Sequence, residues 1–282
     1  MAKNLKYDEI GYWSEIKLDI IREYATAYSK ILRSQSKPEF YHIYIDAFAG
    51  AGQHLSKTTG DFVTGSPINA LLVEPPFFEY HFIDLNEHKI EELERLVGTR
   101  QDVFIYNEDC NDVLLDKILP RAKYENYRRA LCVLDPYGLH LDWEVLRTVG
   151  QMRSVEIFLN FPVADMNRNV LWRDPDRVSQ AQADRMNRFW GDNSWRDIAY
   201  EPAKQLNLFG NSEEEKVSNE TIVDAFRMRL KEVAGFKHVP KPIAMRNTQN
   251  AVVYYLFFAS HKPVAEDIVK DIFKKYGGRR GS

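Results

Sequence analysis

The sequence predicts an α/β fold built on a mostly parallel sheet, and three observations indicate it. First, five apolar segments have the length and composition of strands. They cover residues 41–48, 80–85, 102–110, 129–141 and 154–162. Second, helical patterns separate these segments, and strands that alternate with helices form parallel sheets through right-handed crossovers. Third, residues 241–247 and 251–260 read as a closing strand pair, so the last strand of the sheet is expected to be antiparallel.

The helices predicted around these strands complete one α/β domain. Residues 13–33 carry apolar side chains at helical spacing, and Ser66 with Pro67 reads as a helix start. Further helices are predicted over 87–97, 111–122, 143–149 and 263–276. Residues 53–65 read as a polar loop. Residues 165–235 are polar, mostly helical and without a convincing strand. We therefore expect an α/β domain over 1–164 and 236–282, with 165–235 as a helical insertion that could cap a substrate.

Composition limits the class of protein. The chain of 282 residues is 44% hydrophobic and 28% charged, with a net charge of −3, which is ordinary for a soluble protein. The longest apolar run, 251–259, is strand-sized, and the N-terminus lacks a basic-then-apolar signal, so a cytoplasmic protein is predicted. The two cysteines and seven histidines show no metal-ligand spacing, so no metal site is expected. The modest charge disfavours a surface coated by nucleic acid, although a local basic cleft stays compatible with it.

The segment YIDAFAGAG, residues 44–52, runs from a strand into a glycine turn. Three ligands compete for such a turn. A phosphate-binding P-loop needs a lysine and a hydroxyl residue that do not follow Gly50. A dinucleotide site prefers a third glycine and an immediate helix, whereas only Gly50 and Gly52 are present before a long stretch of loop. S-adenosylmethionine (SAM) remains, because its sulfonium and carboxylate groups require close approach of the backbone.

Acidic residues at the ends of neighbouring strands support the SAM hypothesis. Asp84 in HFIDLN can accept both ribose hydroxyls, and Asp109 in NEDC, or an adjacent amide, can meet the adenine amine. Open α/β sheets bind ligands at this carboxyl edge. A single Asp after a strand is commonly a helix N-cap, but several together with the glycines favour a cofactor role. The predicted cofactor-binding residues are Asp46, Phe48, Gly50, Gly52, Asp84, Asp109 and Cys110.

A second signal is the end of the fourth strand, where Asp135, Pro136, Tyr137 and Gly138 follow an apolar run. The Asp135 carboxylate can accept a hydrogen bond from an amine, and the Pro136 carbonyl can accept another. Tyr137 can stack on a planar heterocycle, which is worth about 1–3 kcal/mol per base in nucleic-acid sites. Asp135, Pro136 and Tyr137 are therefore the predicted catalytic residues, for methyl transfer to an exocyclic amine.

Three further residues are weaker candidates for substrate contact. Asn160 in FLNFP ends the fifth strand, where capping is an equal alternative. Lys17 could reach a cofactor carboxylate, although a snorkelling surface lysine is the favoured interpretation. Arg168 belongs to a set of arginines and aromatic residues that could form a basic, aromatic face or simply a helical cap with solvated arginines and core tryptophans. That set is Arg168, Arg173, Arg177, Arg185 and Arg188 with Trp172, Phe189 and Trp190.

The combination of DAFAGAG and DPYG resembles the amino-methyltransferases of nucleic acids, whose motifs are D-x-F-x-G-x-G and [DN]-P-P-[YF]. One proline stands here where those enzymes have two. DPYG is closer to the D-P-[FY]-G of tRNA guanine-N2 dimethyltransferases, and this departure leaves the acceptor base open.

Over nearly its whole length the chain resembles the three-Cys-motif partner (TcmP) family. The resemblance is carried by YWSEIKLDIIREY, YIDAFAGAG, GSPINAL, FIDLN, VLDPYG, FLNFP and YYLFFAS, in that order. It implies a Rossmann-like class I fold, SAM as cofactor, and genomic association with a separate protein that carries three cysteines, of radical-SAM type. The leading hypothesis is a SAM-dependent methyltransferase acting on an exocyclic amine of a nucleobase in RNA or DNA. The alternatives are a small-molecule or protein methyltransferase and a methyltransferase-like partner subunit.

Overall fold

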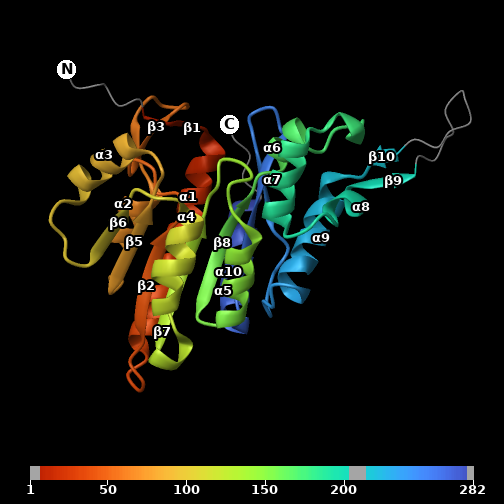
Figure 1. The fold of residues 1–282 in the computed structure, drawn as a ribbon. Helices are drawn as coiled ribbons and strands as arrows, with labels where there is room; N and C mark the ends of the chain where they lie inside the picture. Colours follow the sequence, from red (N-terminus) through yellow and green to blue (C-terminus); the bar gives the residue numbers. More distant parts are fainter. Residues whose placement is uncertain (1–6, 203–213, 278–282) are drawn as a thin grey trace, which may run out of the picture.

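The computed structural model describes residues 7–202 and 214–277, and its centre is a seven-stranded sheet between two layers of helices (Figure 1). In chain order the strands are β2 (Tyr41–Asp46), β5 (Glu79–Ile83), β6 (Val103–Tyr106), β7 (Arg128–Leu134), β8 (Val155–Phe161), β11 (Ile243–Arg246) and β12 (Val252–Ala259). In space their order is β11-β12-β8-β7-β2-β5-β6.

The sheet is parallel from β6 to β8, and β12 is antiparallel to both of its neighbours. The predicted sheet, mostly parallel with an antiparallel last strand, is therefore confirmed. Chain order proceeds outward from β2 to β6 on one side and from β7 to β8 on the other. The point between β2 and β7 is thus a topological switch point, where open α/β sheets bind ligands at their carboxyl edge.

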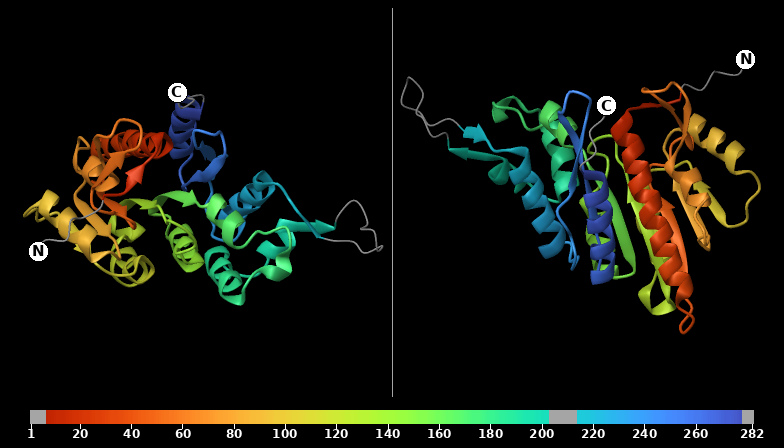
Figure 2. Two further views of the ribbon diagram at one scale, coloured as in Figure 1. Left: turned by 90° about the horizontal axis from the view of Figure 1, so that it is seen from above. Right: turned by 180° about the vertical axis from the view of Figure 1, so that it is seen from behind.

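One helical layer is formed by four helices that share a hydrophobic cluster with the sheet. They are α1 (Tyr12–Ser34), α2 (Ser66–Leu71), α3 (Glu87–Val97) and α10 (Pro263–Gly277). The helix predicted over 13–33 forms because Ile16, Ile20 and Tyr24 recur on one face, and all three are buried. Figure 2 shows α1 and α10 side by side on this face of the sheet.

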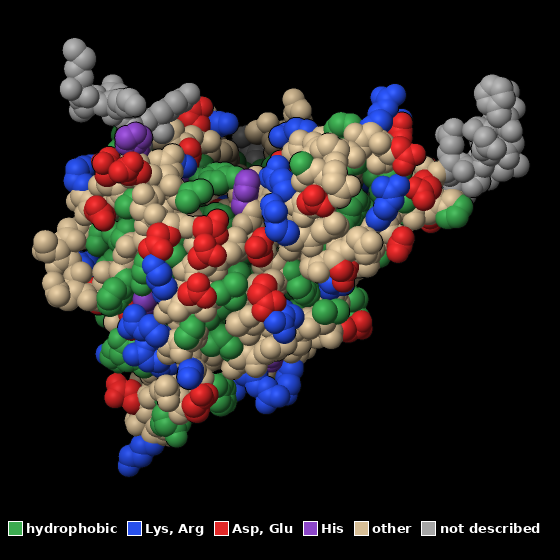
Figure 3. Space-filling view, viewed as in Figure 1, with side chains coloured by type: hydrophobic (Ala, Val, Ile, Leu, Met, Phe, Trp, Pro, Cys, Tyr) green, Lys and Arg blue, Asp and Glu red, His purple; other side chains and the backbone are tan. Residues whose placement is uncertain are grey.

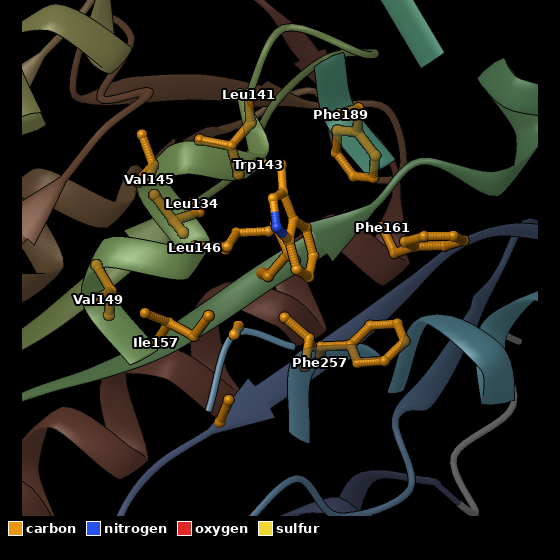
Figure 4. Packing of buried hydrophobic residues seen from close by; sticks show 14 of the residues in the cluster. Leu134, Leu141, Trp143, Val145, Leu146, Val149, Ile157, Phe161, Phe189 and Phe257 are labelled. Carbon is orange, nitrogen blue, oxygen red and sulfur yellow. The ribbon is translucent and has the colours of Figure 1, made fainter. Parts of the chain in front are cut away.

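The other layer includes the predicted insertion. Its helices are α4 (Cys110–Asp112) continued by the short turns Val113–Ile118 and Leu119–Arg121, α5 (Trp143–Met152), α6 (Val163–Asn169), α7 (Gln180–Trp190), α8 (Trp195–Ala199) and α9 (Asn219–Glu232). Figure 4 shows Trp143 of α5 between Leu146, Phe161 and Phe189. Phe189 belongs to the insertion, which therefore shares one core with the sheet. Among the described residues, no helix has the length and apolar character needed to cross a bilayer.

Two predictions of irregular structure are wrong. Residues 53–65 hold β3 (Gln53–Ser56) and β4 (Phe62–Thr64), which form a small sheet with β1 (Glu9–Ile10). The insertion likewise contains the antiparallel pair β9 (Tyr200–Pro202) and β10 (Glu214–Lys216). These strands are only two to four residues long, so they are too short to show the apolar alternation by which strands are recognised in a sequence.

Candidate cofactor and catalytic site

The turn after β2 contains two glycines with positive φ, and a backbone hydrogen bond holds it in place. Gly50 and Gly52 have φ of +63° and +77°, which favours glycine, and the Gly65 amide donates to the Gly52 carbonyl at 2.8 Å. A Cβ on Gly52 would lie 2.9 Å from Leu93 Cδ1, whereas a Cβ on Gly50 would meet open space. Gly52 is therefore favoured both by its positive φ and by the close Leu93 side chain, whereas the buried Gly50 has free space beside its Cα.

Asp84 joins this turn to the next strand. It follows β5 directly and is buried. One of its oxygens accepts a hydrogen bond from the Gly50 amide at 2.8 Å, and the other accepts from the Asn86 amide at 2.8 Å. Each carboxylate oxygen retains a second lone pair. The structure thus brings together two residues predicted to bind the cofactor, and it leaves Asp84 able to accept hydroxyl donors.

Asp46 is the last residue of β2, and its side chain is fully buried. Its Oδ1 accepts from the Phe48 amide at 3.2 Å, while its buried Oδ2 has no partner among the described residues. Burial raises the pKa of Asp46 to about 7. An unpartnered carboxyl oxygen beside an open glycine turn fits a ligand that carries a hydrogen-bond donor, such as the amino group of SAM.

The third predicted strand ends earlier than expected, which changes the position of Asp109. β6 ends at Tyr106, and Asp109 caps α4 by accepting from the Asn111 amide at 2.8 Å. The helix-cap alternative is thus observed for this residue. Cys110 lies in the core, and burial raises the pKa of its thiol to about 12, so the side chain is an unreactive apolar group. The Asn111 side chain donates to the His140 carbonyl at 3.0 Å, which ties α4 to the loop after DPYG.

Asp135 follows β7 and lies at the carboxyl edge of the sheet, like the Gly50 turn and Asp84. Several polar side chains surround it. Its Oδ2 is paired with the Lys17 ammonium, and its Oδ1 accepts from the Asn160 amide at 2.8 Å. Asn160 Nδ2 also lies 3.5 Å from the Pro136 carbonyl oxygen, while its own Oδ1 is buried without a partner among the described residues. The structure therefore brings together four of the predicted site residues.

The interpretation of Lys17 as a snorkelling surface residue is wrong. Its side chain is buried, and burial by itself would lower the pKa of the ammonium. The adjacent Asp135 carboxylate outweighs that effect and raises the pKa above its usual value, so Lys17 is charged at neutral pH. Lys17 is a fixed partner of Asp135.

Tyr137 presents an accessible ring at this site. It is 66% exposed. Its hydroxyl donates to Asp8 at 3.0 Å and accepts from Lys89 at 3.3 Å, and the Lys89 ammonium lies 5.0 Å from the ring centroid. The segment before β1 and helix α3 thus hold the hydroxyl end and leave much of the ring exposed.

His54 was not predicted from the sequence as a site residue. It lies on β3, its Nδ1 is buried without a partner among the described residues, and burial followed by the charge of Lys17 lowers its pKa. The imidazole is therefore neutral at pH 7. No sequence pattern indicates His54 as a site residue, because the segment 53–65 lacks the pattern of a strand.

Among the described residues, no hydrogen bond or ion pair joins the Arg168 side chain to Asp135 or its partners. Arg168 is exposed on α6, and within the described chain its recorded contact is the Trp172 indole donating to its carbonyl at 2.6 Å. Phe189 and Trp190 are fully buried, so the predicted basic, aromatic face is wrong for these two side chains. They are core residues, as the alternative interpretation expected. On the face shown in Figure 3, basic and acidic side chains are intermixed.

Comparison with known proteins places the fold. No family model and no curated protein matches the chain. The solved structure of protein LPL1258 from Legionella pneumophila, described by the family model DUF519, is 10% identical over 94% of each chain, with a TM-score of 0.50. A SAM-dependent methyltransferase from Leishmania major is 12% identical over 86% of this chain and 72% of that one, with a TM-score of 0.40. Another from Mesorhizobium loti is 14% identical over 77% and 89%, with a TM-score of 0.35. Similarity at these levels of identity concerns the fold alone; the sheet order described above is itself Rossmann-like.

Proposed function

We propose that this protein is a SAM-dependent methyltransferase that transfers a methyl group to an exocyclic amine of a nucleobase in RNA or DNA. One observation carries the proposal. The Gly50 turn clamped by Asp84 and the Asp135-Pro136-Tyr137 segment lie at the same edge of the sheet, on the two sides of its switch point. A cofactor site and an acceptor site are thereby adjacent.

The residues around the turn suit SAM, which supplies a methyl group attached to a sulfonium. The free space beside the Cα of Gly50 would admit a ligand that must approach closely. The remaining lone pairs of Asp84 would accept the ribose hydroxyls, and Asp46 Oδ2 would accept from the amino group. Near the end of β6, Asp109 retains acceptor capacity for the adenine amine although it also caps α4.

Asp135 and Pro136 would act on the acceptor nitrogen. The lone pair of an exocyclic amine is delocalised into its ring. Hydrogen bonds from its N–H groups to Asp135 and to the Pro136 carbonyl favour a tetrahedral nitrogen and stabilise its developing positive charge. Lys17 and Asn160 hold the Asp135 carboxylate in one orientation while leaving it a second lone pair on each oxygen. As the nitrogen–carbon bond forms, the sulfur–carbon bond breaks, and the extra proton then leaves to solvent.

A nucleobase is the proposed substrate because Tyr137 offers an exposed aromatic ring beside Asp135. Bases stack on such rings with little dependence on sequence. A base inside a duplex would first be flipped out, at a cost of a few kcal/mol. The intermixed charges of Figure 3 give no large basic field on that face, so the proposal depends on the site rather than on surface charge. Salt-sensitive binding of polynucleotide would separate this substrate class from a small molecule or a protein.

The decisive experiment is mass spectrometry of nucleosides from cells with and without the gene. We expect one N-methylated nucleoside to be missing from cells that lack the gene. It should appear again when purified protein and labelled SAM are added to RNA or DNA from those cells. Asp84→Ala should lose SAM binding in calorimetry, whereas Asp135→Ala should keep SAM binding and lose transfer. Full activity of Asp135→Ala would refute the catalytic assignment.

The resemblance to the TcmP family supports a further proposal, that the protein works with a separate three-cysteine protein. Co-purification with a cysteine-rich partner would support this association. If such a complex forms and no methyl transfer is detected with or without it, the protein is a partner subunit rather than an enzyme.

A further inference from the structure

A cavity lies at the opposite end of the sheet from the candidate site. Its volume is about 290 Å³, close to the lower end of the range for small-molecule pockets. Its lining comes from the last turns of α1, the first turns of α10 and the beginnings of β7 and β8. Because those strands are parallel, their beginnings lie at the edge away from Asp135. No residue of the candidate site lines this cavity.

The walls of the cavity are aromatic and apolar, and they carry polar atoms without partners. Tyr28 is only 7% exposed, and its hydroxyl has no hydrogen-bond partner among the described residues. Both ring nitrogens of His261 are likewise buried without a hydrogen bond of normal geometry within that part of the chain, although the nearby backbone of Gly150 opposes part of the fall in its pKa. Burial raises the pKa of Tyr28 and lowers that of His261, so both are neutral at pH 7. A buried polar atom left without a partner is costly, so these groups favour a bound molecule.

The charged groups at the cavity favour an anion. Arg129, Arg153 and Lys262 line it, together with the first turn of α10, whose backbone dipole is positive at this end. The Arg129 guanidinium is fixed over the Tyr124 ring, 3.8 Å from its centroid, and donates to the Tyr124 carbonyl at 3.0 Å.

The acidic residue in the lining is Glu156. Its two oxygens already accept from the hydroxyls of Tyr24 and Ser260, and burial raises its pKa. Glu156 therefore opposes an incoming anion less than a free carboxylate would. Three cations and a helix N-terminus outweigh one engaged carboxyl group.

We infer that this cavity is a binding site for a planar aromatic molecule that carries one carboxylate, separate from the methyl-transfer site. The ring would lie among Tyr28, Phe40 and Ile268, and the carboxylate would face Arg129 and Lys262. This inference does not depend on the proposed function, because no residue of the cavity takes part in it.

The test compares three probes that share one ring system and differ in charge. They are 2-naphthoate, 2-naphthamide and 2-naphthylmethylamine. Each is titrated into the full chain, whose isoleucine methyl groups are isotopically labelled, and binding is followed by NMR. We expect 2-naphthoate to shift the Ile31 and Ile268 resonances in a saturable manner, and to bind at least tenfold more tightly than the neutral amide. Ile83, beside the candidate cofactor site, should not shift. Equal affinities for the three probes, or shifts elsewhere only, would overturn the inference.

Two variants locate the site. Ile268→Trp fills the cavity and should weaken 2-naphthoate binding at least tenfold, whereas Met228→Trp, on a half-exposed position of α9 outside the cavity, should leave it unchanged. Arg129→Gln should reduce the preference for naphthoate over naphthamide to less than threefold. Because Arg129 also supports the fold, Lys262→Gln at an exposed position is a second test of the same preference. Full affinity in Ile268→Trp would exclude this cavity as the site.

Discussion

The two ends of the central sheet hold polar groups in different ways. At the carboxyl end, Asp84 and Asp135 are each held by two hydrogen-bonding or ionic partners within the described chain. At the amino end, Tyr28 and His261 face a cavity with polar atoms that have no partner there. The first arrangement fixes the direction of charged groups, as electrostatic catalysis requires. The second leaves hydrogen-bonding capacity for a ligand to complete.

The topology explains part of this difference. At the carboxyl end, the parallel strands run into turns that lead to helices, after β2 by way of β3 and β4, so acidic side chains and a glycine turn meet around the switch point. At the amino end of β7 and β8, α1 contributes aromatic side chains and α10 contributes aliphatic ones to the wall of the cavity. Four sets of variants test the rigidity and the role of the carboxyl end.

The largest loss of stability from a single substitution is expected for the Lys17–Asp135 pair. Asp135→Ala leaves the buried Lys17 ammonium without its counter-charge, which should lower the free energy of unfolding by about 3 kcal/mol. Urea denaturation measures this change. The double variant Lys17→Met/Asp135→Ala removes both charges and should recover at least half of the loss. A single variant as stable as the parent would contradict the pairing.

The next effect concerns the pH dependence of stability through Asp46. Its pKa is about 7 in the folded protein and near the ordinary 3.8 in the unfolded chain, so between these values the folded state binds more protons. Stability should therefore fall as pH rises from about 4 to about 7, by up to about 4 kcal/mol for this group. Asp46→Asn cannot ionise and should flatten that slope in denaturant titrations at several pH values. An unchanged slope would show that Asp46 is not the group responsible.

A smaller, paired effect separates the two turn glycines. Gly52→Ala adds a Cβ at positive φ and 2.9 Å from Leu93, so we expect about 2 kcal/mol of destabilisation. Gly50→Ala has only the strain of its positive φ, about 1 kcal/mol, because its Cβ meets open space. Its main effect should be on SAM affinity, with a loss of at least tenfold in calorimetry. If the larger loss of SAM affinity occurs in Gly52→Ala, the roles of the two glycines are reversed.

The sequence predicts the strand ends of the site well, because an apolar run followed by an acid or a glycine turn is a local signal. Gly50, Asp84 and Asp135 were identified in this way. The burial of Lys17 was not predicted, since its partner lies 118 residues further along the chain. His54 was missed for a similar reason, because β3 is stabilised by pairing with β1 from the beginning of the chain. For Asp109 the sequence allows both a helix cap and a ligand contact, and the cap becomes evident only once the ends of β6 and α4 are known.

The smallest effect is expected at Tyr137, where the ring and the hydroxyl have separate roles. Tyr137→Phe removes the contacts to Asp8 and Lys89 at an exposed position, so stability should change by less than about 1 kcal/mol. The ring remains, and the KM for a nucleic-acid substrate should stay within about threefold of the parent. Tyr137→Ala removes the ring as well and should raise KM about tenfold or more, because base stacking contributes about 1–3 kcal/mol. Equal KM values for the Phe and Ala variants would place the substrate away from this ring, and the carboxyl end would then bind the cofactor without Tyr137 as its acceptor platform.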